Sequence, residues 1–88
     1  MSDPISAVEA ALEQAGRSCL RLIGTRSLSA EQSRKLAKWM FGCMNQRYTI
    51  RRRVEDRGTG ELAKVLKFVS RAWEDLQQID EDTADADE

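Results

Sequence analysis

The 88-residue chain contains no histidine, and this absence excludes several common kinds of functional site at once. Histidine is the most frequent general base and metal ligand in proteins, and it is one half of every Ser-His or Cys-His dyad. The glycines at 58 and 60 do not form a phosphate-binding loop, because the lysine and the spacing of a P-loop are missing. We therefore expect a protein that is not an enzyme, with no catalytic residue, no metal, no cofactor and no small-molecule substrate.

Cysteine is scarce as well, and the two that are present do not form a CxxC pair. Cys19 and Cys43 each fall on the apolar side of a predicted helix, so we expect two buried, reduced thiols and a cytoplasmic protein. The first residues include Asp3 and Pro4 and have neither the basic region nor the apolar run of a secretory signal. No stretch approaches the length of apolar chain that crosses a membrane, so no membrane partner is expected.

Three segments carry clear signals for the start and end of a helix. Asp3 followed by Pro4 is typical of a helix start, and the first helix is predicted over residues 4–23, before Gly24. Ser29 and Gln32 match a capping box, which predicts a second helix over residues 29–57 with its stop at Gly58. Thr59 caps the third helix, predicted over residues 59–79.

Apolar residues in the first and third predicted helices recur at intervals of three and four. This spacing predicts that both helices pack nearly parallel to another helix, as in bundles. The connections at 25–28 and at 58 are short, and short connections join antiparallel neighbours. The predicted fold is therefore all-α: an antiparallel three-helix bundle over residues 1–80, without strands, followed by a disordered acidic tail at 81–88.

The middle helix has a wider apolar arc than two flanking helices are expected to cover. Aromatic residues and methionines beside arginines are enriched in protein interfaces, so this helix is the predicted docking element for another protein. A second copy of the chain is one candidate partner, since most soluble oligomers are homo-oligomers. The predicted partner-binding residues are Trp39, Phe41, Arg47, Tyr48 and Arg51.

Two simpler interpretations of these residues remain open at this stage. The aromatic residues can belong to the core of the bundle. Arg47 and Arg51 can form ion pairs within the chain, because the antiparallel arrangement places them near Asp3, Glu9 and Glu13.

The charge of the chain is strongly separated although the net charge is only −1. Residues 28–58 hold eight basic and three acidic residues, whereas residues 80–88 hold six acidic residues and no basic one. A basic helix can bind phosphates, so nucleic-acid binding is the alternative function. The candidate residues are Lys35, Lys38, Arg52, Arg53 and Arg57.

The sequence thus favours a small regulatory or adaptor protein that binds a protein partner through residues 29–57 and self-associates. The alternatives are the nucleic-acid binder and a structural subunit of a larger assembly. The acidic tail is expected to aid solubility, or to fold back over Arg34, Lys35 and Lys38.

Overall fold

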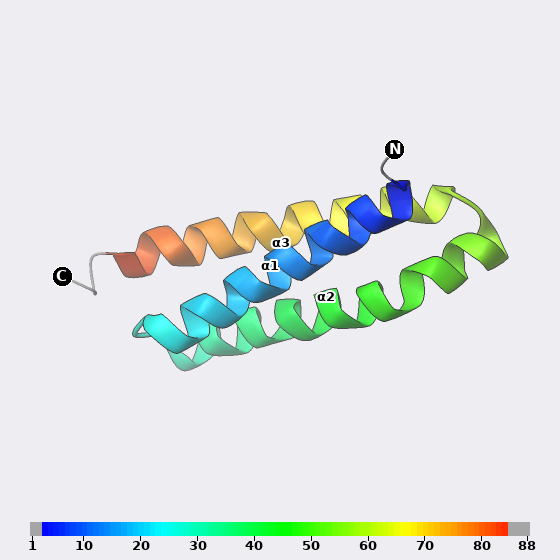
Figure 1. The fold of residues 1–88 in the computed structure, drawn as a ribbon. Helices are drawn as coiled ribbons and strands as arrows, with labels where there is room; N and C mark the ends of the chain where they lie inside the picture. Colours follow the sequence, from blue (N-terminus) through cyan, green and yellow to red (C-terminus); the bar gives the residue numbers. More distant parts are fainter. Residues whose placement is uncertain (1–2, 85–88) are drawn as a thin grey trace.

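A computed structural model of the chain, described here for residues 3–84, contains three α-helices and no strand within that range. They are α1 (Pro4–Thr25), α2 (Ala30–Arg57) and α3 (Gly60–Ala84), which lie side by side in an elongated molecule (Figure 1). The all-helical class and the number of helices agree with the sequence prediction. The second helix runs without interruption over 28 residues, or about 42 Å at 1.5 Å per residue.

The predicted helix starts are present in atomic detail. The Asp3 carboxylate accepts a hydrogen bond from the backbone N–H of Ile5, and Pro4 opens α1. Ser29 and Gln32 form both hydrogen bonds of the capping box that begins α2. The helix ends at Gly58, whose φ of 92° lies in a region that favours glycine.

The end of α3 differs from the prediction. The helix continues to Ala84, so residues 81–84 are helical and do not belong to a disordered tail. Arg26 supplies the physical reason: its guanidinium pairs with the Asp80 carboxylate at 2.8 Å and donates to the Asp80 carbonyl and the Thr83 hydroxyl. Thr83 itself is buried and donates to the carbonyl of Ile79. The rest of the predicted tail, residues 85–88, lies outside the described range.

Contacts between helices show which ends lie together. Arg51, near the end of α2, reaches Asp3 and Glu9 at the start of α1. Arg53 of α2 reaches Glu61 at the start of α3. Figure 1 shows the same arrangement, with the start of α1 and the start of α3 at one end of the molecule.

Two connected clusters of buried side chains form the core along the bundle, and Trp73 packs against both. The buried apolar residues are Val8, Leu12, Ala15, Cys19, Leu22, Leu36, Cys43, Ile50, Val65, Val69, Ala72, Leu76 and Ile79. Both cysteines are free and buried, as the sequence predicts. None of the helices described in residues 3–84 is sufficiently long and apolar to cross a membrane.

Candidate docking surface on α2

The side of α2 that faces away from the core carries a row of exposed apolar side chains. Core contacts are made by Leu36, Cys43 and Ile50, which recur every seven residues. Residues 37, 41, 44 and 48 recur at intervals of four, three and four, so they share a different face of the helix. We call Ala37, Phe41, Met44 and Tyr48 the outer stripe.

Three members of the outer stripe are large and largely open to solvent. The exposed fractions are 63% for Phe41, 47% for Met44 and 83% for Tyr48. Ala37 is partly buried at the same row. Within residues 3–84, α1 and α3 leave most of the Phe41 and Tyr48 side chains and about half of Met44 uncovered.

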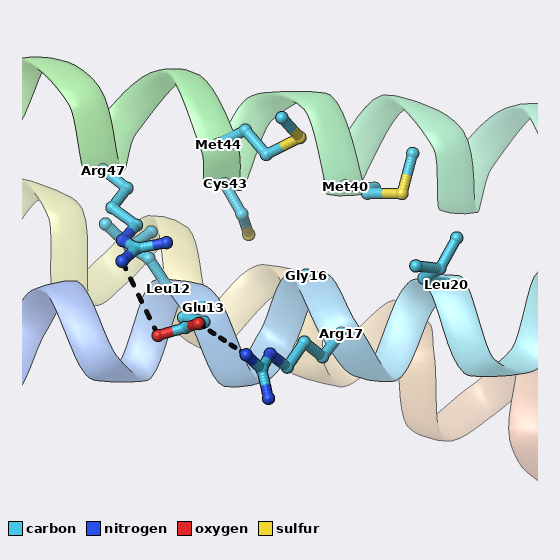
Figure 2. A pocket seen from close by; sticks show the side chains of 9 residues that line it. All are labelled: Leu12, Glu13, Gly16, Arg17, Leu20, Met40, Cys43, Met44 and Arg47. Atoms are coloured by element: carbon cyan, nitrogen blue, oxygen red, sulfur yellow. Dashed lines mark hydrogen bonds and ion pairs between the residues drawn. The ribbon is translucent and has the colours of Figure 1, made fainter.

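An apolar groove of about 200 Å³ runs between α1 and α2 beside the outer stripe. Figure 2 shows Leu20 of α1 opposite Met40 of α2, with Gly16 of α1 facing Cys43 of α2. Met44 belongs both to this groove and to the outer stripe, so the two form one continuous surface. Leu20 is 57% exposed and had no place in the sequence prediction. Leu20 falls outside the buried apolar positions of α1, which recur at intervals of three and four residues. A large apolar residue off that pattern is a sequence signal for an exposed apolar side chain.

Two predicted docking residues, Arg47 and Arg51, are engaged by carboxylates of α1. Arg51 pairs with Glu9 at 2.9 Å and with Asp3 at 3.4 Å, and it donates to the Ser6 hydroxyl. The hydrogen bond from Arg51 to Glu9 raises the pKa of the guanidinium. Arg47 lies 3.7 Å from Glu13. These are the intramolecular ion pairs that the sequence left open, and both arginines border the apolar surface while paired with α1.

In Figure 2, Glu13 lies between two arginines at the rim of the groove. Its carboxylate is 2.9 Å from Arg17 of its own helix and 3.7 Å from Arg47 of α2. The rim therefore holds two guanidinium groups around one carboxylate.

Trp39 occupies a different place from the other predicted docking residues. Its indole N–H donates to the Asp75 carboxylate of α3 at 2.7 Å, and its ring meets Phe68 edge-on with centroids 5.1 Å apart. It also packs against the core cluster around Leu36 and Leu76. Trp39 therefore takes part in the contact between α2 and α3, on a different side of α2 from the exposed ring of Phe41.

The residues predicted for nucleic-acid binding do not form one free basic surface. Arg53 and Arg57 both face Glu61, at 3.0 and 3.9 Å, and Arg53 also donates to Gln46. Lys35 lies 4.0 Å from Asp75. Lys38 and Arg52 are exposed and form no ion pair with any residue of the described range. Of the five candidates, these two are the ones with no carboxylate of residues 3–84 within ion-pair distance.

Glu61 is a buried carboxylate that the sequence did not single out. Hydrogen bonds from Lys64 and from Arg53 hold its pKa below the ordinary value, so the side chain is ionised and paired. In the cysteines burial acts in the opposite direction. It raises the pKa of Cys19 to about 12, with a smaller contribution from Cys43, whose own pKa is also raised by burial. Such thiols are poor nucleophiles.

Among residues 3–84, no cluster of three or more cysteine or carboxylate side chains is arranged to hold a metal ion. Comparison of the chain with protein-family models, curated proteins and solved structures finds no match in any of the three.

Proposed function

We propose that this chain is a small antiparallel three-helix protein that acts without enzymatic activity, by binding another protein through α2. Such a protein would serve as a regulator or adaptor in the cytoplasm. One observation carries the proposal: Phe41, Met44 and Tyr48 form a single exposed apolar row beside an apolar groove.

The physical support is the cost of leaving this row in water. Burying one large apolar side chain is worth about 1.5–3 kcal/mol, so a partner that covers three of them gains a substantial driving force. Contiguous exposed apolar surfaces on soluble proteins mark interaction sites, whereas single exposed residues do not. Phenylalanine, tyrosine, methionine and arginine are also the residues enriched at interfaces, and all four are present here.

A non-enzymatic role agrees with the chemistry of the titratable groups. The chain contains no histidine, and the thiols of Cys19 and Cys43 have raised pKa values that disfavour the thiolate. The lowered pKa of Glu61 follows from its ion pairs, and a carboxylate so paired is a weak base. A cytoplasmic location suits two free cysteines that are both buried.

Nucleic-acid binding receives less support. A basic surface attracts phosphates through cations that are free to release counterions. Of the five candidate residues, Lys35, Arg53 and Arg57 already lie beside carboxylates. The geometry therefore favours a protein partner.

Affinity capture from the producing cell tests the proposal. A tagged full-length chain should retain a defined set of proteins, and the double variant F41S/Y48S should lose them by about tenfold or more, as expected for interface anchors. The variant L66S is the matched control, because Leu66 is an exposed apolar residue on α3. Equal retention by all three chains, each with an unchanged far-ultraviolet circular dichroism spectrum, would contradict the proposal.

A further inference from the structure

The outer stripe has one arginine, Arg34, beyond its first end; beyond its other end two exposed carboxylates outnumber the single exposed arginine without an ion pair, Arg52. Arg34 lies three residues before Ala37, and Glu55 lies seven residues after Tyr48, so both continue the row on the same face of α2. Both side chains are exposed, and neither forms an ion pair with another residue of the described range. Asp56 follows Glu55 and places a second exposed carboxylate at this end.

A surface with this order of charges is complementary to itself when one copy is reversed. Met44 lies close to the midpoint between Arg34 and Glu55, ten residues after the first and eleven before the second. A two-fold axis passing beside Met44 would therefore bring Arg34 of each copy to the carboxylates of the other. It would also bring the exposed ring of Phe41 to that of Tyr48, and Met44 to its own counterpart. A two-fold interface of this kind uses the same patch on both subunits.

We propose that the occupant of the outer stripe is a second copy of this chain, whose α2 packs antiparallel on the first about this axis. The inference rests on the proposed docking function and names its partner. A parallel pairing would place Arg34 against Arg34, and like charges at close range disfavour it. Arg51 also lies between Tyr48 and Glu55, but Asp3 and Glu9 already balance its charge.

The same geometry contains one unfavourable pair. Lys38 lies six residues before Met44 and Arg52 eight residues after it, on the same side of the stripe, so the antiparallel pairing brings Lys38 of one copy near Arg52 of the other. Both are exposed and lack an ion-pair partner in residues 3–84. Replacing a basic residue by glutamate is thus expected to weaken the dimer at position 34 and to strengthen it at position 38.

Sedimentation equilibrium of the full chain at low salt, over a range of concentrations, tests the inference. The native chain should shift from a mass of 10.0 kDa toward twice that value as its concentration rises. R34E should weaken the dimer by about fivefold or more, because repulsion replaces attraction at two symmetric places. K38E makes the identical change in net charge and should tighten the dimer, since it places a carboxylate opposite Arg52.

The double variant R34E/E55R tests whether residue 34 of one copy contacts residue 55 of the other. Exchanging the two charges restores opposite signs only if residue 34 of one copy meets residue 55 of the other, so dimerisation should recover relative to R34E. A native chain that stays at 10.0 kDa throughout would overturn the inference, as would a double variant no better than R34E. If the chain is monomeric and the capture experiment still yields proteins lost in F41S/Y48S, the docking function stands and the second copy is not the occupant. If the chain is monomeric and the native chain also captures no protein that F41S/Y48S loses, both the docking function and the dimer are contradicted.

Discussion

Trp39 shows how a single polar atom decides the place of a large side chain. The indole N–H points at Asp75 of α3, and the ring lies against Phe68, so the residue joins two helices. A tryptophan in a partly apolar setting normally finds an acceptor for its N–H. Asp75 provides it, and the hydrogen bond is strengthened by the negative charge of the carboxylate.

Removing this N–H should destabilise the fold. We expect Trp39→Phe to lower the free energy of unfolding by about 1–3 kcal/mol, because the Asp75 carboxylate loses a charge-assisted hydrogen bond. Urea denaturation followed by circular dichroism measures the change. Tyr48→Phe is the control: this ring is 83% exposed, so its effect should stay within about 0.5 kcal/mol. Equal losses in both variants would contradict the assignment of Trp39 to the helix contact.

At the scale of the helices, the side chain of Phe68 from α3 packs directly over a glycine of α2, Gly42. A Cβ atom at Gly42 would lie 2.7 Å from Cζ of Phe68, well inside contact distance. The Phe68 ring cannot move away freely because Trp39 packs against it. Gly42 therefore permits the aromatic contact between these helices, although glycine is an unfavourable residue in a helix interior.

We expect Gly42→Ala to destabilise the protein by about 1–2 kcal/mol, because the overlap with Phe68 outweighs the better helix propensity of alanine. Gly24→Ala provides the matched control, since a Cβ there meets no atom within 4 Å. That variant should be neutral or stabilise by up to about 1 kcal/mol. Thermal unfolding of both variants measures the difference in stability. If Gly42→Ala is more stable than the native chain, the Phe68 ring can move aside and the account of this contact is wrong.

The junction of α2 and α3 depends on the ionised form of Glu61. Its folded-state pKa is lowered from an ordinary value of 4.5, so the paired carboxylate stabilises the fold fully above pH 4.5. This stabilisation is lost as the pH falls from 4.5 through the lowered pKa, where the folded state takes up its proton. We therefore expect Glu61→Gln to be less stable than the native chain at pH 7 and the gap to shrink at pH 3. Urea titrations at both pH values measure it, and a constant gap would mean that the charge is unimportant.

At the scale of the whole molecule, the features that can be predicted from the sequence are those set by residues close together in the chain. The capping box at Ser29, the stop at Gly58 and the buried positions of α1 and α3 are all set by residues close in the chain. The extension of α3 to Ala84 depends on Arg26, which is 54 residues from Asp80, so no local pattern contains it. Trp39 lies at the margin of the apolar arc, where only the position of α3 decides whether it is covered.

The exposed apolar surface of α2 follows only in part from the sequence, for the same reason. Phe41 and Tyr48 follow from helix periodicity, because the arc of α2 is wider than its neighbours can cover. Leu20 could not be assigned, since the groove exists only after α1 is set against α2. Whether Arg47 and Arg51 face a partner or α1 also depends on the placement of Glu13, Glu9 and Asp3.

Photo-crosslinking in the producing cell tests the central claim, that the outer stripe of α2 is covered by protein. The full chain would carry p-benzoylphenylalanine in place of Tyr48, or in place of the exposed Ser70 of α3 as the control. We expect a discrete protein adduct on irradiation from position 48 and none from position 70. No adduct from position 48, or equal adducts from both positions, would contradict the claim.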